Sequence, residues 1–324
     1  MVAQSSRGYR RVLITGADGF IGSHAMEHLL ATTTWDLVLP CSFTKGGMSP
    51  RITSSAHYQR NKHRVTVIHH DLRAPIDDIT RAQIGEDCDA CIHFAAASHV
   101  DTSIEAPAEF IRNNVDVTIN LLEWARRQHA LRILIQISTD EVYGPASGGE
   151  AHAEWSPILP SNPYAASKAA QEAIAISYWR TYGVPVVLTN TMNNIGEKQH
   201  PEKFVPKIIR SLLRGEAVPV HAVEWVKDWG PDSARPPEVR HAVGSRYYLH
   251  ARNHADACRW LIERDAVSAY PAPGRDGPFA DRPDRWNVVG EVEIANDELV
   301  GMIAGMLGRP PLITYVDAHT ARPG

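Results

Sequence analysis

Tyr164 and Lys168 are the two residues whose types and spacing most directly allow chemistry. They stand four positions apart at the start of a predicted helix over 163–182, so both side chains lie on one face of that helix. A lysine charge beside a phenol stabilises the tyrosinate and lowers its pKa, which makes the phenol usable as a base near neutral pH. The YxxxK pattern is common, and its position after the fifth predicted strand is what favours catalysis over a surface pair.

A second group of reactive side chains closes that fifth strand: Ser138, Thr139, Asp140 and Glu141. In open α/β sheets, ligands bind beyond the carboxyl ends of the strands. Two adjacent acids beside a hydroxyl suit acid–base chemistry when their surroundings separate their pKa values. An isolated Asp-Glu pair is more often a loop cap followed by a solvated side chain, and at this point that alternative stays open.

A glycine turn indicates where a cofactor binds. Gly16, Gly19 and Gly22 follow the first predicted strand and lead into a helix, and Phe20 and Ile21 stand between the last two glycines where that helix begins. The first glycine permits the tight turn, the second lets a pyrophosphate approach the backbone, and the third lets the helix pack closely on the strand. The free N–H groups of the helix start then bind the phosphates. The pattern predicts a dinucleotide site, and a purely structural turn is the alternative.

The end of the second predicted strand departs from this pattern. An acidic residue usually stands there and binds the adenosine ribose, but Cys41 occupies the position. Lys45 or Arg51 could instead meet a 2′-phosphate. We therefore expect NAD as the cofactor and keep NADP open as an alternative.

The elements that position these residues alternate between strand and helix. Apolar runs predict six strands, over 12–15, 37–39, 65–69, 90–94, 131–137 and 184–188. Helical spacing predicts helices over 21–30, 107–129 and 163–182, the last ended by Gly183. Repeated β-α-β units imply a doubly wound, Rossmann-type α/β fold with a parallel sheet and helices on both faces.

The pattern loosens after about residue 190. Helices are expected near 202–214, 253–263 and 295–307, with short strands near Val218, Tyr247 and Asn287. Residues 222–244 read as an inserted loop and 269–283 as a Pro/Gly-rich loop. We therefore expect an NAD-binding domain over 1–190 and a smaller, mainly substrate-binding domain over 191–324, some segments of which return to the first sheet.

Composition limits the class of protein. The chain has 324 residues, of which 44% are hydrophobic and 22% charged, with a net charge of -4. These values are typical of a globular protein and give no reason to expect nucleic acid as a partner. No apolar run is long enough for a signal peptide or a membrane span, so a cytoplasmic location is expected. Cys88 and Cys91 lack a second ligand pair, and no metal site is expected.

Several motifs together resemble one family. Residues 138–144, STDEVYG, are similar to the signature of the dTDP-glucose 4,6-dehydratases, which belong to the extended short-chain dehydrogenases/reductases. The same order and spacing hold for Ala95-Ala96, Ser98-His99-Val100-Asp101, Asn162-Pro163-Tyr164, Ser167-Lys168, Asn193-Asn194 and Pro201-Glu202-Lys203. The resemblance covers most of the chain and matches poorly over 42–64 and 222–245.

The resemblance implies a nucleotide-sugar 4,6-dehydratase, a lyase of deoxysugar biosynthesis. In that family Tyr164 would take the proton of the sugar 4-hydroxyl while hydride leaves C4 for NAD+, and Thr139 would bind the sugar near that hydroxyl. Glu141 would then remove the C5 proton, and Asp140 would protonate the departing 6-hydroxyl. The stored hydride returns to C6, so NAD+ is regenerated in each turnover.

The resemblance also implies contacts and an assembly. It points to cofactor contacts from Asp71, Leu72, Ala95, Ala96, Asn114 and Ser138, and to substrate contacts from Ser98, His99, Thr139, Asn193, Asn194, Lys203 and Arg246. Lys203 and Arg246 supply the positive charge that a diphosphate needs. The helices over 107–129 and 163–182 resemble the family's dimer interface, so a homodimer is expected.

Some positions depart from the family pattern. Ala97 stands where Glu is usual. Tyr247, beside the expected diphosphate contact Arg246, and Asn253, beside His254, replace acids of the family pattern. The family pattern usually continues past Gly324, so either a shortened chain or a smaller substrate domain is expected. These departures leave the base and the sugar open. The alternatives are a nucleotide-sugar 4-epimerase or UDP-glucuronate decarboxylase of the same fold, and a non-catalytic NAD(P)-binding regulator.

Overall fold

The computed structural model describes residues 11–44, 48–146, 151–227, 238–264 and 281–317. The chain divides into two compact units, one of Met1–Asn194 with His250–Val288 and one of Ile195–Leu249 with Val289–Gly324. The first unit thus includes a late segment of the chain. The division of labour expected from the sequence, NAD in one domain and the nucleotide sugar in the other, stays a prediction.

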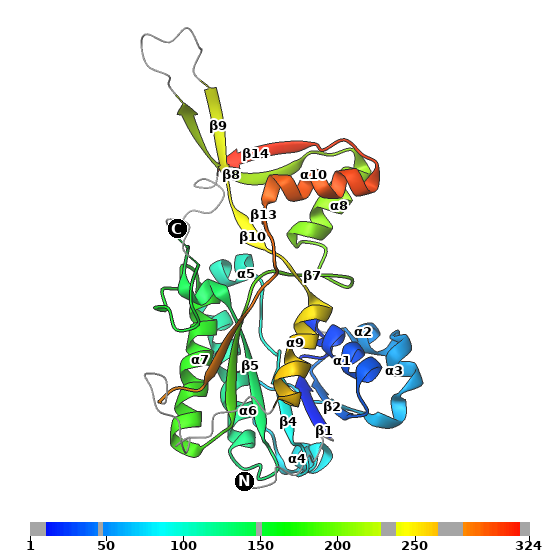
Figure 1. Ribbon diagram of the computed structural model, residues 1–324. Coiled ribbons are helices and arrows are strands. Elements are labelled where there is room, and N and C mark those ends of the chain that lie inside the picture. Colours follow the sequence, from blue (N-terminus) through cyan, green and yellow to red (C-terminus); the bar gives the residue numbers. More distant parts are fainter. Residues whose placement is uncertain (1–10, 45–47, 147–150, 228–237, 265–280, 318–324) are drawn as a thin grey trace. The chain divides into compact units, whose positions relative to one another are not determined.

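A seven-stranded parallel sheet forms the centre of the first unit and confirms the predicted α/β fold (Figure 1). Its strand order is β12-β6-β5-β4-β1-β2-β3. The strands are β1 (Arg11–Thr15), β2 (Asp36–Cys41), β3 (Val65–His69), β4 (Ala90–His93), β5 (Ile133–Thr139), β6 (Val186–Thr191) and β12 (Asp284–Val288).

Helices cover both faces of this sheet (Figure 1). One apolar cluster includes side chains of α1 and α9 and one set of strand side chains. A second cluster includes side chains of α6 and α7 and the strand side chains that point to the other face of the sheet. The longer helices are α1 (Phe20–Thr32), α6 (Pro107–Ala125), α7 (Pro163–Tyr182) and α9 (Ala251–Glu263). The shorter ones are α2 (Ser49–Thr53), α3 (Ala56–Arg60), η1 (Lys62–Arg64), α4 (Asp78–Ile84), α5 (Val100–Glu105) and η2 (Asp140–Tyr143).

Strand β5 lies inside the sheet, between β6 and β4, and every one of its residues is buried. A parallel strand that is covered on both faces is expected to be a nearly continuous apolar run, which its first residues, Ile133, Leu134 and Ile135, provide. The strand ends at Thr139, whose hydroxyl oxygen accepts the N–H of Glu141 at 3.3 Å and so caps η2. The local sequence therefore places the polar residues directly at the carboxyl edge of the sheet.

The second unit is smaller and has its own apolar core. It contains the three-stranded sheet β14-β8-β9, the pair β10-β13 and two helices. Their bounds are β8 (Val218–Lys227), β9 (Glu238–Val243), β10 (Ser245–Tyr247), β13 (Glu293–Ala295), β14 (Ile313–Asp317), α8 (Phe204–Arg214) and α10 (Asn296–Leu307). The two-residue strands β7 (Asn194–Ile195) and β11 (Leu249–His250) pair where the chain changes unit.

The predicted inserted loop over 222–244 is wrong at both of its ends. Residues up to Lys227 continue β8, and Glu238–Val243 form β9, which pairs with β8 antiparallel. The run from Val218 to Trp225 alternates β-branched, aromatic and polar residues, a pattern that favours a strand. The intervening residues 228–237 lie outside the described part of the chain, as do residues 269–280 of the second predicted loop.

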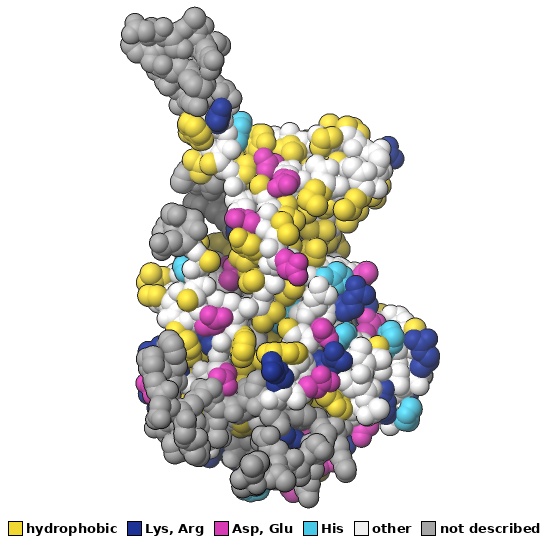
Figure 2. All heavy atoms as spheres, viewed as in Figure 1, with side chains coloured by type: hydrophobic (Ala, Val, Ile, Leu, Met, Phe, Trp, Pro, Cys, Tyr) yellow, Lys and Arg dark blue, Asp and Glu magenta, His cyan; other side chains and the backbone are white. Residues whose placement is uncertain are grey.

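The second unit leaves apolar side chains on its surface. Figure 2 shows them over the part of this unit where α10 lies, and Met302 and Met306 of that helix are 43% and 79% exposed. Among the described helices of the whole chain, none combines the length and the apolar composition of a membrane-spanning helix.

Candidate active site

Four of the predicted catalytic residues lie together at the carboxyl end of β5. Thr139 ends the strand, Asp140 and Glu141 follow it in η2, and Tyr164 approaches from the first turn of α7. The Thr139 hydroxyl donates to Asp140 Oδ1 at 3.2 Å, and a side-chain hydrogen bond joins Thr139 to Tyr164. The expected phenol, hydroxyl and two carboxyls therefore form one cluster.

Asn162 orients one of these carboxyls. Its Oδ1 accepts the N–H of Ala165 at 2.8 Å and caps α7, while its Nδ2 donates to Glu141 Oε2 at 3.1 Å. One side chain thus connects the start of the helix that carries Tyr164 to the proposed C5 base. No role was predicted for Asn162 from the sequence, although an Asn directly before Pro163 is a recognisable helix start.

The pKa of Tyr164 is raised from its ordinary value. Burial is the largest cause, the charges of Glu141 and Asp140 raise the pKa further, and the hydrogen bond with Thr139 lowers it. The predicted lowering of this pKa by Lys168 is wrong, because the ammonium group is directed to a backbone carbonyl. Tyr164 is therefore protonated near neutral pH, and its use as a base needs a further positive charge beside it.

Lys168 lies one turn further along α7 and is 4% exposed. Its Nζ donates to the carbonyl oxygen of Ile137 at 2.6 Å. Burial lowers the pKa of Lys168 to about 8, and the nearby charge of Glu172 opposes that lowering. The amine of Lys168 is consequently protonated in about half of the molecules in mildly alkaline solution.

The glycine turn is shaped for a group that approaches the backbone closely. Gly16 has φ +67°, and a Cβ there would lie 2.9 Å from the nitrogen of Ala95. A Cβ on Gly22 would lie 2.2 Å from the carbonyl oxygen of Gly16. Gly19 caps α1 without a side chain, so the N–H groups of the first helical turn point outward with no intrahelical acceptor. This cradle fits the pyrophosphate of a dinucleotide.

A series of buried hydrogen bonds holds the loop after β4 against this turn. Thr15 Oγ1 accepts the N–H of Ala95 at 3.2 Å and lies 2.7 Å from Nδ1 of His93, whose Nε2 lies 3.3 Å from Thr118 Oγ1. Burial lowers the pKa of His93 to about 3, so this ring is neutral. A neutral ring can accept from Thr15 and donate to Thr118, and the predicted cofactor residues Ala95 and Ala96 are thereby fixed beside Gly16.

Asn114 secures the next residue of the same loop. Its Oδ1 accepts the N–H of Ala97 at 2.7 Å, and its Nδ2 lies 3.0 Å from the carbonyl oxygen of Ala97 and 2.8 Å from Ser167 Oγ. Asn114 is fully buried. It therefore contacts the predicted cofactor loop from the protein interior.

The end of β2 is built around an inward-facing acid. Cys41 is 1% exposed, and its thiol shares a hydrogen bond with the carboxylate of Asp18. That carboxylate also accepts the N–H of Phe43 at 3.0 Å, and Arg51 donates to the Asp18 carbonyl oxygen at 3.2 Å. Burial raises the pKa of Asp18. The carboxylate is thus engaged by protein groups at the place where a ribose-binding acid is expected.

The remaining predicted contacts are distributed over both units. In the first unit, Asp71 pairs with Arg73, Leu72 is buried, and the buried hydroxyl of Ser138 has no hydrogen-bond partner among the described residues. The loop before α5 carries Ser98 and His99, and Asn193 and Asn194 follow β6. Lys203 and Arg246 belong to the second unit, at the start of α8 and in β10.

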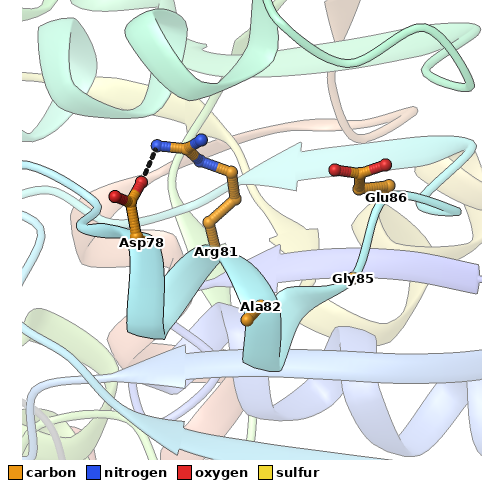
Figure 3. A pocket seen from close by; sticks show the side chains of 5 residues that line it. All are labelled: Asp78, Arg81, Ala82, Gly85 and Glu86. Atoms are coloured by element: carbon orange, nitrogen blue, oxygen red, sulfur yellow. Dashed lines mark hydrogen bonds and ion pairs between the residues drawn. The ribbon is translucent and has the colours of Figure 1, made fainter.

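A separate surface depression of about 470 Å³ lies beside α4. Asp78, Arg81, Ala82, Gly85 and Glu86 line it, and Figure 3 shows Arg81 turned toward Asp78, with 2.6 Å between their nitrogen and oxygen. Gly85 precedes the amino end of β4. Because all strands of the sheet are parallel, this depression lies at the edge opposite Thr139 and has no part in the cluster.

Residues 12–271 match the NAD dependent epimerase/dehydratase family. The chain belongs to this family. It is 33% identical over 308 residues to a dTDP-glucose 4,6-dehydratase of Neisseria meningitidis serogroup B, covering 92% of this chain and 76% of that protein. It is 39% identical over 304 residues to one of Streptomyces niveus, covering 92% and 78%.

A solved structure of another dTDP-glucose 4,6-dehydratase supports the family assignment. The enzyme comes from Streptomyces venezuelae and was determined as a double mutant with NAD bound. It superposes with a TM-score of 0.75 at 29% identity, covering 96% of this chain and 86% of that one. This member of the epimerase/dehydratase family therefore shares its fold with an enzyme that holds NAD.

Proposed function

We propose that the protein is an NAD-dependent nucleotide-sugar 4,6-dehydratase, which converts an NDP-hexose of the dTDP-glucose or UDP-glucose type to the 4-keto-6-deoxy sugar. The observation that carries the proposal is the arrangement of Asp140 and Glu141 beside Thr139 and Tyr164. Oxidation at C4 needs Tyr164, but only loss of water needs both an acid and a base next to it. The relatives at 32–39% identity support the same reaction.

The residues of the site divide the proton transfers among themselves. When bound, NAD+ supplies a positive charge and a reversible acceptor for the hydride of C4. Tyr164 then takes the proton of the 4-hydroxyl through its phenolic oxygen, and Thr139 hydrogen-bonds the sugar at that hydroxyl. Glu141, oriented by Asn162, removes the C5 proton that the 4-ketone has made acidic. Asp140 gives a proton to the departing 6-hydroxyl, which leaves as water. Return of the stored hydride to C6 and of a proton to C5 would then complete the 4-keto-6-deoxy product.

The glycine cradle of Gly16, Gly19 and Gly22 would hold the pyrophosphate of NAD, with Phe20 and Ile21 contributing helix N–H groups. Ser138, Ala95 and Ala96 would line the nicotinamide side. Asp71 and Leu72 would lie toward the adenine. For the substrate, Ser98, His99, Asn193 and Asn194 would contact the sugar, and Lys203 and Arg246 would offset the diphosphate charge.

Incubation with candidate substrates tests the proposal. The purified protein is incubated separately with dTDP-glucose, UDP-glucose, UDP-N-acetylglucosamine, GDP-mannose and UDP-glucuronate, and the products are followed by mass and by absorbance in base. A dehydratase gives a product lighter by one water with a base-absorbing ketone. A 4-epimerase gives an isomer of unchanged mass, a decarboxylase acting on UDP-glucuronate releases carbon dioxide, and a regulator gives no product. Each of those three results would contradict the proposal.

The proposal extends to assembly as a homodimer through α6 and α7. These helices pack against each other, and Ile174, Ile176 and Tyr178 of α7 are only partly buried within one chain. Tyr182, at the end of α7, is 52% exposed. Sedimentation equilibrium should give twice the mass of the chain, and a monomer at micromolar concentration would contradict this part. The cytoplasmic location stays a prediction.

A further inference from the structure

Helix α7 carries a third ionisable residue, Glu172, one turn after Lys168. Its side chain is 0% exposed, and the proton transfers proposed above do not use it. Its Oε2 accepts from Arg285 Nη2 at 2.6 Å, and its Oε1 accepts from Asn190 Nδ2 at 2.7 Å. Each carboxylate oxygen thus has a donor, which a buried carboxylate requires.

Asn190 connects this carboxylate to the end of the catalytic strand. It lies in β6, beside β5, and is fully buried. The second hydrogen of its amide is available to the carbonyl oxygen of Thr139, which lies 3.0 Å from Nδ2. Thr139 is the point at which the chain leaves β5 and turns into η2. The amide of Asn190 therefore fixes the backbone from which the side chains of Thr139 and Glu141 project.

Arg285 connects the same carboxylate to the segment that follows η2. Its Nη1 donates to the carbonyl oxygen of Glu154 at 3.1 Å, and its guanidinium carbon lies 4.3 Å from the centre of the Trp155 ring. The side chain of Arg285 is 1% exposed. Since Arg285 comes from β12, it reaches this position only because β12 pairs with β6.

Charges near Lys168 give Glu172 a second role. The Glu172 carboxylate opposes the lowering of the Lys168 pKa by burial. The other titratable group facing Lys168 is His93 of β4, which is neutral. Tyr143 faces Arg285 of the Glu172–Arg285 ion pair. The acids Asp140 and Glu141 face Tyr164. Among the groups named here, Glu172 is the anion that acts on the lysine.

A buried ion pair is not explained by stability alone. Replacing such a pair with apolar side chains of similar volume is often neutral or stabilising, because desolvation of both charges offsets their attraction. We infer that Glu172, with Arg285 as its counter-charge, is a positioning residue of this site: through Asn190 it fixes Thr139, and it presents the negative charge that faces Lys168. This inference rests on the proposed function, in which Thr139 binds the sugar, and it adds that turnover needs Lys168 in its charged form.

Asn190→Ala tests the connection to Thr139. The ion pair keeps its charges in this variant, but the Thr139 carbonyl oxygen and Oε1 of Glu172 each lose a donor. We expect kcat for the 4-keto product to fall by about tenfold to a hundredfold with KM unchanged, because a small displacement of a reacting group has effects of that size. Thr189→Val is the matched control, since Thr189 is a buried residue of β6 whose hydroxyl has no hydrogen-bond partner in the described part of the chain. It should keep the wild-type kcat and KM.

Glu172→Gln/Arg285→Met tests the charge that faces Lys168. The two substitutions remove both charges with little change of volume, and the new amide oxygen can still accept from Asn190. In the wild type, kcat should fall as pH rises through about 8, the pKa of Lys168. In the double variant this fall should begin on the order of one pH unit lower, because Lys168 has lost its anion. Arg285→Lys keeps the counter-charge and should retain the wild-type pH profile.

Two results would overturn the inference. One is an Asn190→Ala protein with wild-type kcat. The other is a double variant whose activity falls equally at all pH values, which a purely structural role predicts. Failure of the wild type to form any 4-keto product would instead contradict the proposed function. In that case, hydrogen exchange of the peptide spanning Thr139–Tyr143 tests the positioning role without any need for activity. Exchange of this peptide should be faster in Asn190→Ala than in Thr189→Val, and equal exchange would overturn the inference.

Discussion

The carboxyl ends of β5 and β2 lie at the same edge of one sheet, but the acidic side chains near these two ends have different surroundings and different roles. After β5, Asp140 and Glu141 are partly exposed and lie beside a hydroxyl and a phenol. Near the end of β2, Asp18 is 4% exposed, and its carboxylate accepts from Phe43 and shares a hydrogen bond with Cys41. The first pair is placed to exchange protons, and the second acid holds a loop in place.

This difference shows that an acid at a strand end does not by itself indicate a ligand. Whether such an acid can bind a ligand depends on whether protein donors already satisfy its carboxylate. At β5 the donor from Asn162 occupies one oxygen of Glu141 and orients the group. At β2 the protein donors hold Asp18 in the interior. Substitutions at either strand end therefore test whether the two acids differ in this way.

Removing the phenol at the β5 end should have the largest effect. In Tyr164→Phe no group takes the proton of the 4-hydroxyl, and we expect turnover to fall by about a thousandfold or more. Rapid mixing with substrate should show no reduced cofactor in the near ultraviolet. Since the substitution removes no charge, the melting temperature should stay close to that of the wild type. Rapid cofactor reduction by this variant would show that another residue is the base.

Removing the carboxyls should separate oxidation from dehydration. We expect Glu141→Gln to slow formation of the 4-keto-6-deoxy product by about a hundredfold, with a similar or smaller effect of Asp140→Asn, because each loses one proton transfer. Reduction of bound NAD+ should persist in both and accumulate during turnover. Normal product from the Asp140→Asn/Glu141→Gln double variant would refute the assignment, and Glu154→Gln, outside the cluster, serves as the control.

The pH dependence should follow Lys168. Its pKa is lowered to about 8, so the protonated fraction falls tenfold for each pH unit well above that value. If the ammonium is the active form, kcat should decline on the alkaline side of about pH 8. Cofactor binding measured by fluorescence over the same range separates this decline from loss of NAD. A kcat that is constant up to pH 10 would contradict the role of the charge.

The smallest effect is expected at the β2 end. Because the carboxylate of Asp18 is already engaged, discrimination between NADH and NADPH should be weak, and Arg51 is the cation beside the turn. Arg51→Leu should weaken NADPH binding by about two- to fivefold while NADH binding stays constant, as expected for a partly exposed ion pair. Fluorescence titration measures both constants. Arg60→Leu on α3 is the control, and equal weakening of both cofactors would disprove a specific phosphate contact.

Much of the fold was predictable because apolar periodicity determines buried parallel strands. All six predicted strands are present, and β5 is shifted by two residues, from the predicted 131–137 to Ile133–Thr139. The seventh strand, β12, was foreseen only as a short strand near Asn287. The ends of the 222–244 segment were misassigned because their strand pattern adjoins a Pro-rich and charged stretch, and composition outweighed alternation in the prediction.

The candidate site was predictable where a local motif contains it. Thr139, Asp140, Glu141 and Tyr164 belong to short motifs, and their proximity follows from the topology of the sheet. Asn162 was within reach, because an N-cap signal precedes its proline. Arg285 was not, since 113 positions separate it from Glu172 and no local pattern marks the pairing. The raised pKa of Tyr164 also depends on burial, which spacing does not report.

The origin of β12 late in the chain has a consequence for biosynthesis. Every residue assigned to proton transfer has left the ribosome once Lys168 has emerged, but Arg285 follows only after the whole segment 195–249. Until then the nascent protein would have to bury Glu172 without its counter-charge, which is strongly unfavourable. The first unit therefore cannot mature ahead of the rest during translation, and a prematurely terminated polypeptide ending before residue 284 would carry the full set of reactive side chains without a competent catalyst.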